Sequence, residues 1–248
     1  MDSAFGVFMV PIKLHATARV KLQDSVQRLR DFDLEISDQA SFELGFDSSW
    51  WVRDAEGRRL QIDFDSNRRD YWRAHKGRGE PLARALGIKD SIREVVDLTA
   101  GLGIDAVFMA RLGFRVTALE RNPLIAFLLQ EARKNSERQD LVGLKFVFAP
   151  AQSFLESFEL EEPTSAYFDP MYPESKKSAL PRQEMRLFRD LVGDDTDSQS
   201  VLRRALEIPF YRVVVKRPVR ALPLVEKPAY QLEGKLVRYD VYYPKGAP

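Results

Sequence analysis

Residues 95–106 read VVDLTAGLGIDA, an apolar run followed by an acid, a glycine loop and the start of a helical pattern. Val95 and Val96 are typical of the end of a buried strand. Gly101 and Gly103 follow in a loop, where glycine lets the backbone approach a ligand closely and adopt positive φ. Ligands of open α/β sheets bind beyond the carboxyl ends of the strands. The stretch therefore predicts a ligand site at a strand–loop–helix turn.

Strand and helix patterns alternate on both sides of this loop. Predicted strands lie at 93–98, 114–120, 144–149, 164–169, 212–217 and 235–243, and predicted helices at 79–88, 104–113 and 123–137. Alternation of this kind favours a parallel, doubly wound sheet with helices on both faces. We therefore expect an α/β fold with a Rossmann-like sheet.

Residues 1–65 do not show this alternation of strands and helices. The segment 25–32 has helical spacing, whereas 41–46, 50–54 and 59–64 alternate like short antiparallel strands, with a hairpin loop at 54–58. The first 20 residues lack the basic start of a signal peptide and are interpreted as containing a buried strand. The pattern predicts a small, antiparallel N-terminal α+β domain at 1–75 and a Rossmann-like domain at 76–248.

Bulk composition restricts the class of protein. The 248 residues are 44% hydrophobic and 30% charged, as in globular proteins with a sizeable core. The absence of cysteine excludes disulfides and thiolate metal sites, and the only histidines, His15 and His75, argue against a His-rich metal centre. No apolar run approaches the roughly 18–20 residues that span a bilayer. We expect a cytoplasmic protein with no metal and no membrane partner.

A second acid supports a nucleotide-containing ligand. Glu120 ends the next predicted strand, where a carboxylate can accept both hydroxyls of a ribose. Two cofactors fit this arrangement. Gly101-x-Gly103-x-x-Ala106 matches the dinucleotide pattern, which favours NAD and hydride transfer. S-adenosylmethionine uses the same place, and Asp97 could reach its amino-acid part. Asp97 and Asp105 would repel a diphosphate in a low-dielectric cleft, which favours the sulfonium cofactor.

The segment 167–173, YFDPMYP, follows the predicted strand at 164–169 and should face the same crevice. Its two prolines stop a strand or a helix, so the simplest interpretation is a turn. A functional interpretation is a clamp for a planar exocyclic amine. In it a carboxylate and a backbone carbonyl accept the two N–H groups while an aromatic ring stacks on the base. The predicted catalytic residues are Asp169, Pro170 and Tyr172.

Two basic segments are candidates for contact with nucleic acid, although the net charge of +1 gives no such indication. Basic side chains near aromatic rings suit phosphate contacts with base stacking, and the alternative is a solvated helix face. The candidates are Arg68, Arg69, Arg73, Lys76 and Arg78 in the first segment, and Lys176, Lys177 and Arg182 in the second.

Five motifs in order resemble one family. They are DLTAGLGIDAVFMARLG, ALERNP, DPMYP, KKSALPRQEMRLFRDLVG and VVVKRP. Together they are similar to the ribosomal RNA small subunit methyltransferase J family, and the resemblance runs from residue 77 to residue 243. It implies a class I methyltransferase that uses S-adenosylmethionine. It also implies that the protein methylates the N2 amine of a guanine in 16S rRNA, with 16S rRNA or the small subunit as partner.

The resemblance also implies cofactor contacts. They fall on Asp105, on Glu120 with Arg121, on Gln152 and Ser153 near the adenine, and on Asp169. The family usually has arginine where this sequence has Ile104, so a contact there depends on the backbone, and Tyr172 replaces a phenylalanine. With Asp97, Gly101 and Gly103 these residues form the predicted cofactor site.

Three other functions stay open at this point. They are methylation of an adenine or cytosine amine, hydride transfer with NAD, and RNA binding without catalysis. Enzymes of the first kind usually have a second proline in the Asp-Pro turn, at the position of Met171. Asp97 and the lack of a nearby histidine count against the second. The third leaves Asp97, Glu120 and Asp169 without a purpose.

Overall fold

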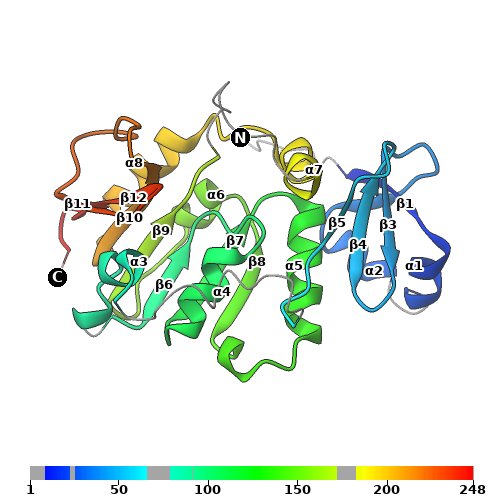
Figure 1. Cartoon of the computed structure of the whole chain (residues 1–248), viewed down its shortest axis with the longest axis horizontal. Helices are drawn as coiled ribbons and strands as arrows, with labels where there is room; N and C mark the ends of the chain where they lie inside the picture. The colour runs from blue at the N-terminus through cyan, green and yellow to red at the C-terminus, as the bar shows by residue number, and fades with distance from the viewer. Residues whose placement is uncertain (1–8, 23–25, 66–78, 91, 172–182, 248) are drawn as a thin grey trace. The chain divides into compact units, whose positions relative to one another are not determined.

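The computed structural model describes residues 9–22, 26–65, 79–90, 92–171 and 183–247 (Figure 1). The chain forms two compact units, each with its own sheet. The described residues of the first unit are 9–22, 26–64, 122–136 and 183–193, and those of the second are 65, 79–90, 92–121, 137–171 and 194–247. The division of the sequence between residues 75 and 76 stays a prediction.

The first unit contains a five-stranded sheet in the order β2-β1-β3-β4-β5. Its strands are β1 (Val10–Leu14), β2 (Leu34–Ile36), β3 (Phe42–Phe46), β4 (Trp50–Asp54) and β5 (Arg59–Gln61). The antiparallel pairing of β3, β4 and β5 confirms the three predicted strands and the predicted hairpin between β4 and β5. The prediction of a wholly antiparallel sheet is wrong, because β1 pairs in parallel with both β2 and β3.

The described residues of the first unit also form four helices: α1 (Ala16–Lys21), α2 (Val26–Arg30), α5 (Pro123–Asn135) and α7 (Gln183–Val192). Helix α5 is tied to the N-terminal segments by Glu131, a buried carboxylate. Glu131 accepts hydrogen bonds from Arg28 Nε at 2.6 Å and from Trp50 Nε1 at 3.0 Å. Phe127 of α5 packs edge-on against Trp50 and Phe32. These contacts join segments more than 70 residues apart in the sequence.

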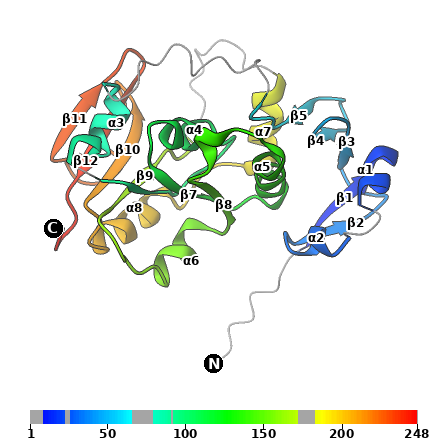
Figure 2. The same ribbon diagram turned by 90° about the horizontal axis from the view of Figure 1, so that it is seen from below.

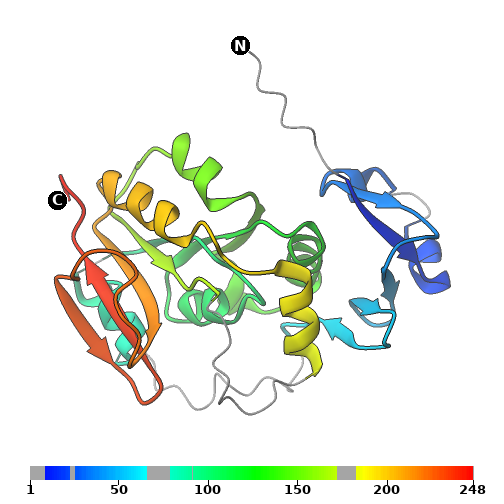
Figure 3. The same ribbon diagram turned by 90° about the horizontal axis from the view of Figure 1, so that it is seen from above.

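The second unit contains a seven-stranded sheet in the order β11-β12-β10-β9-β6-β7-β8. The strands are β6 (Glu94–Asp97), β7 (Arg115–Glu120), β8 (Leu144–Phe148), β9 (Thr164–Phe168), β10 (Arg212–Pro218), β11 (Tyr230–Glu233) and β12 (Val237–Tyr242). Strands β6 to β10 are parallel, which confirms the Rossmann-like sheet. The last strand, β12, lies antiparallel between β10 and β11 (Figure 3).

Helices cover both faces of the large sheet, as predicted. The helical segments of this unit are α3 (Pro81–Ala85), a 3₁₀ turn at Ile88–Asp90, α4 (Ile104–Arg111), a 3₁₀ turn at Gln139–Leu141, α6 (Ala151–Glu156) and α8 (Ser198–Glu207). Helices α3 and α4 lie on one face, and α6 and α8 on the other (Figure 2). Side chains of β6, β9 and β10 form an apolar core with α6 and α8. The opposite face of the same strands is therefore the one that meets α4.

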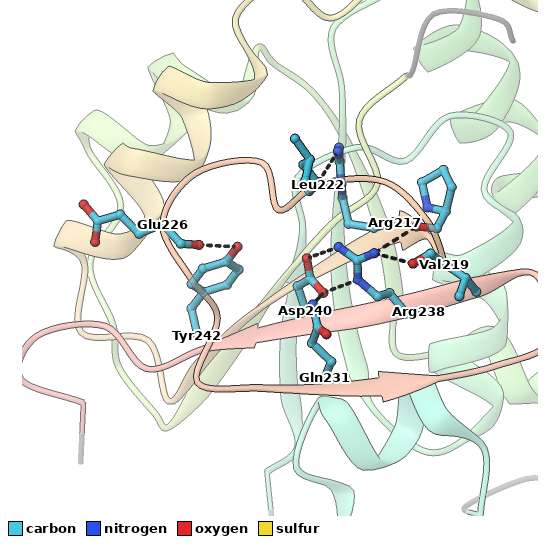
Figure 4. A network of polar contacts seen from close by, with 9 residues as sticks. Arg217, Val219, Leu222, Glu226, Gln231, Arg238, Asp240 and Tyr242 are labelled. Atoms are coloured by element: carbon cyan, nitrogen blue, oxygen red, sulfur yellow. Dashed lines mark hydrogen bonds and ion pairs between the residues drawn. The ribbon is translucent and has the colours of Figure 1, made fainter.

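A buried polar network fixes the loop after β10 (Figure 4). Arg238 of β12 pairs with Asp240, with Nε 2.7 Å from Oδ1, and both side chains are at most 5% exposed. Arg238 Nη1 also donates to the carbonyls of Pro218 and Val219 at 3.2 and 2.6 Å. Arg217 donates to the Leu222 carbonyl through Nε at 3.0 Å. Side chains of the sheet thus donate hydrogen bonds to the carbonyls of an irregular loop and hold it against the strands.

Replacing Arg238 by methionine is expected to lower the free energy of unfolding by about 3–5 kcal/mol, since the buried Asp240 would lose its ion-pair partner and keep only the hydrogen bond from Gln231 at 2.8 Å. Urea denaturation measures the loss. Arg203→Met is the matched control, because Arg203 lies 4.0 Å from Glu226 with both side chains exposed. That variant should change stability by no more than about 0.5 kcal/mol. Equal effects of the two substitutions would contradict the role of the buried pair.

Candidate active site

Polar side chains from three strands and one helix meet at the carboxyl ends of β6, β9 and β10. Side chains alternate between the two faces of a strand. Because Val96, Phe168 and Val215 lie in the core with α6 and α8, their neighbours Asp97, Tyr167 and Lys216 lie on the face of α4. Asp105 in the first turn of α4 joins them there. The sheet and α4 thus bring Asp97, Asp105, Tyr167 and Lys216 to one place.

Lys216 lies at the centre of this cluster. Its Nζ donates to Asp105 Oδ2 at 2.7 Å and to Asp169 Oδ2 at 2.9 Å. The Tyr167 hydroxyl donates to Asp105 Oδ2 at 2.5 Å. Burial acts to lower the pKa of Lys216, but the two carboxylates outweigh it and hold that pKa well above its usual value. Burial, with Asp105 and Asp169 adding to it, raises the pKa of Tyr167 well above normal. Lys216 is therefore a cation and Tyr167 a neutral donor.

The predicted turn begins at Asp169 and is attached to the glycine loop. The backbone N–H of Asp169 donates to Thr99 Oγ1 at 2.7 Å. Pro170 is buried, whereas Asp169 and Met171 are partly exposed. Burial raises the pKa of Asp169 to about 6 despite the opposing effect of Lys216. At neutral pH the carboxylate is mostly ionised and can accept hydrogen bonds.

The glycine loop has the backbone conformation that the sequence predicts. Gly101 and Gly103 have φ of 54° and 74°, a region that favours glycine. Glu120 at the end of β7 is buried, and its Oε2 accepts from Gly101 N at 3.0 Å. The acid at the end of the second strand therefore faces the loop, as a ribose-binding carboxylate should.

Asp97 is completely buried at the base of the loop. Its Oδ1 accepts from Thr99 N at 3.0 Å, and its Oδ2 has no hydrogen-bond partner among the described residues. Burial raises the pKa of Asp97 well above its ordinary value, and Asp105 and Asp169 add to this effect. A buried polar atom that lacks a protein partner is expected to meet a ligand or a water molecule. The loop and this oxygen therefore suit a ligand with hydrogen-bond donors.

A second ion pair fixes the turn from its other side. Asp195 Oδ2 accepts from Met171 N at 2.6 Å, and its Oδ1 lies 2.5 Å from Arg121 Nη2. Arg121 Nη1 also contacts Asp197 at 3.2 Å. Arg121 is thus directed toward the segment before α8 while it lies next to Glu120 in the sequence. Burial raises the pKa of Asp195, against the effects of Met171 N–H and Arg121.

Asp195→Ala should loosen the turn, because the N–H of Met171 would lose its acceptor. We expect about 1 kcal/mol lower stability from a half-buried donor that loses its partner, together with slower turnover. Asp195→Asn is the matched variant, because its side-chain oxygen can still accept from Met171. Urea denaturation and turnover rates compare the two. Equal losses in the alanine and asparagine variants would contradict a role for the Asp195–Met171 hydrogen bond in holding the turn.

The remaining predicted cofactor residues are Ile104, Gln152 and Ser153, which lie at the starts of helices α4 and α6. Ile104 is half-buried at the start of α4. Gln152 lies near the start of α6, and its buried Oε1 has no hydrogen-bond partner within the described ranges. Ser153 is exposed. Several predicted residues lie outside the described residues: Tyr172, Arg68, Arg69, Arg73, Lys76, Arg78, Lys176, Lys177 and Arg182.

Sequence reasoning missed Thr99, Tyr167, Asp195 and Lys216 as site residues. A signal for Lys216 exists, since it interrupts the valine run of β10 at a position that alternates with Val213 and Val215. The same alternation in β9 separates Tyr167 from Ala166 and Phe168. For Asp195, which lies in a loop far from its partners in the sequence, no local pattern indicates a role.

Comparisons with known proteins show the class to which this chain belongs. A family model described as putative SAM-dependent methyltransferase matches residues 12–244. A crystal structure of a SAM-dependent methyltransferase from Neisseria gonorrhoeae superimposes with a TM-score of 0.71 and 30% identity, covering 96% of this chain and 97% of that one. The fold and the site therefore define an S-adenosylmethionine-dependent methyltransferase. S-adenosylmethionine is its cofactor, as predicted, and the alternative of NAD with hydride transfer is excluded.

Curated relatives identify the family. The ribosomal RNA small subunit methyltransferase J of Bdellovibrio bacteriovorus is 48% identical over 194 residues, which cover 77% of this chain and 77% of that protein. The protein of the same name from Pseudomonas aeruginosa is 40% identical over 231 residues, covering 88% and 84%. This chain belongs to the ribosomal RNA small subunit methyltransferase J family, which confirms the resemblance. Among the helices of the described residues, none has the length and apolar character to cross a membrane.

Proposed function

We propose that this protein transfers a methyl group from S-adenosylmethionine to the exocyclic N2 amine of a guanine in 16S rRNA. The names of its relatives support an rRNA substrate. One observation supports an amine target above others: the 2.7 Å hydrogen bond from Asp169 N to Thr99 Oγ1. Through it, an Asp-Pro turn that suits a planar amine is attached to the loop that suits the cofactor.

The proposed chemistry starts from a weak nucleophile, because the lone pair of the amine is delocalised into the base. Asp169 accepts one N–H and the carbonyl of Pro170 the other, which favours a more tetrahedral nitrogen. The ring of Tyr172 stacks on the base and aligns it. The bound cofactor supplies the methyl group. Positioning of this kind contributes up to about 7–11 kcal/mol in favourable models. The proton leaves the amine after transfer, so the site needs no strong base, and no metal ion.

We further propose which residues bind the cofactor. Asp97, with its unpartnered buried oxygen, is suited to the amino-acid part, and Glu120 to the ribose. Gln152, with its buried Oε1, and Ser153 are proposed for the adenine. The other proposed contacts are the backbone of Gly101, Gly103 and Ile104, and the side chains of Asp105, Arg121 and Asp169.

The substrate partner is proposed to be 16S rRNA or the small ribosomal subunit. A base in a helix would have to leave its stack to reach Asp169. We assign phosphate contacts to the two basic segments, whose residues are Arg68, Arg69, Arg73, Lys76, Arg78, Lys176, Lys177 and Arg182. A protein with this substrate works in the cytoplasm, where small subunits assemble in bacteria.

Nucleoside mass spectrometry of 16S rRNA tests the substrate. Cells that lack this protein should lose one N2-methylguanine, and the protein expressed from a plasmid should restore it. An Asp169→Ala plasmid is the matched control and should not. Loss of a methylated adenine or cytosine instead would favour the alternative amine target. If no methylated nucleoside changes, the proposed rRNA substrate is wrong.

A further inference from the structure

We propose that Lys216 is a positioning residue for methyl transfer, which orients the Asp169 carboxylate and keeps it available as a hydrogen-bond acceptor. The inference rests on the proposed role of Asp169 as acceptor for the target amine. Lys216 belongs to the fifth strand of the parallel run, and neither the cofactor contacts nor the amine clamp proposed above includes it.

The geometry gives the two oxygens of Asp169 different tasks. Lys216 Nζ occupies Oδ2 at 2.9 Å. Among the described residues, none donates a hydrogen bond to Oδ1 of Asp169. The Asp169 side chain is 31% exposed. Since Lys216 is itself fixed by Asp105 at 2.7 Å, it holds Oδ2 in a defined position. Oδ1 is then the oxygen that can accept an N–H of the target.

The charges around Asp169 explain why a cation is needed there. The acidic groups that face the cluster are Asp97 from β6, Asp105 from α4 and Asp195 from the segment before α8, together with the Tyr167 hydroxyl from β9. Lys216 is the cation that opposes burial and these acids in setting the pKa of Asp169, which is about 6. Without it a proton would bind the carboxyl, which would change an acceptor into a donor.

Stability alone does not account for this lysine. The side chain of Lys216 is only 20% exposed, and those of Asp105 and Asp169 are 14% and 31% exposed. Replacing a buried ion group by well-packed apolar side chains is often neutral or stabilising. A cluster of two acids and one lysine at the strand ends is therefore better explained by what it does to Asp169 than by folding.

The test compares pH–rate profiles of the full-length protein. Small subunits from cells lacking this protein are the substrate, with radiolabelled S-adenosylmethionine. The wild type should show an acidic limb near pH 6, the pKa of Asp169 in its cluster. In Lys216→Met this limb should move up by about 1–3 pH units, so that kcat/KM at pH 7 falls about 2- to 100-fold and recovers toward pH 9. Lys216→Arg retains the charge and should keep the limb near its wild-type position.

Arg212→Met is the matched control on the same strand. Arg212 is also a buried cation, paired with Asp90 at 2.6 Å, but it lies at the other end of β10. This variant should lose stability without moving the acidic limb. An unchanged limb in Lys216→Met, or an equal movement in Arg212→Met, would overturn the proposal.

A stability measurement separates this inference from the proposed function. Loss of Lys216 should raise the pKa of Asp169 further in the folded state. A raised carboxyl pKa means that the folded state binds more protons than the unfolded one, so stability falls as pH rises through the folded value. Lys216→Met should therefore lose more stability at pH 8 than at pH 5. Equal losses at the two pH values would contradict the effect of Lys216 on the pKa of Asp169. If this difference is present but Asp169→Ala remains fully active, the amine clamp is what fails.

Discussion

Asp169→Ala is expected to slow methyl transfer by about 100- to 1,000-fold, the range for loss of one preorganised hydrogen-bonding group from an active site. The carboxylate is mostly ionised at neutral pH, because its pKa of about 6 lies below it. Its loss removes the proposed acceptor for the amine, while the attachment of the turn through Asp169 N and Thr99 survives, since that donor is backbone. Single-turnover rates with saturating cofactor measure the effect on the chemical step.

Two variants make this result specific. Asp169→Asn keeps an oxygen that accepts an N–H, so it should retain more activity than the alanine variant. Glu162→Ala removes an exposed acid that pairs with Arg115 at 2.8 Å and should have no effect on the rate. All three should still bind S-adenosylhomocysteine and unfold cooperatively. An Asp169→Ala enzyme with the wild-type single-turnover rate would remove this carboxylate from catalysis.

The large sheet could be predicted because its information is local. Each parallel strand from β6 to β10 is a short apolar run, and short helical patterns or glycines separate the runs. The direction of β1 could not be predicted in the same way. Its alternation of buried and exposed residues is equally compatible with parallel and antiparallel neighbours, and its partners β2 and β3 come later in the chain. Strand direction in such a sheet depends on connections that periodicity does not describe.

The sequence also could not predict that α5 belongs to the first unit. Its apolar pattern predicts a helix of the α/β alternation, and it is one. Yet the buried Glu131 accepts from Arg28 and Trp50, which precede it by more than 80 residues. A glutamate in the middle of a helix usually indicates a solvated face. Only the partners reveal that it is buried, and partners at such separation leave no local pattern.

The site residues likewise include some that the sequence could predict and one that it could not. The glycine loop, Glu120 and Asp169 could be found because each follows a predicted strand, and parallel strands bring their carboxyl ends to one edge. Lys216 follows the same rule and could have been found by strand alternation. Asp195 could not, because its position depends on ion pairing with Arg121 across 74 residues of sequence, 121 to 195.

Glu120→Ala is expected to weaken the binding of S-adenosylhomocysteine by about 100- to 10,000-fold. Each hydrogen bond to a charged acceptor contributes about 1.5–3 kcal/mol, and a ribose offers two hydroxyls. Glu120 also accepts from Gly101 N at 3.0 Å, so its loss should loosen the glycine loop. Isothermal titration calorimetry measures the affinity. Glu120→Gln retains one acceptor oxygen and should lie between the alanine variant and the wild type, with Glu162→Ala equal to the wild type. Unchanged affinity in Glu120→Ala would mean that the ribose binds elsewhere than at the end of β7.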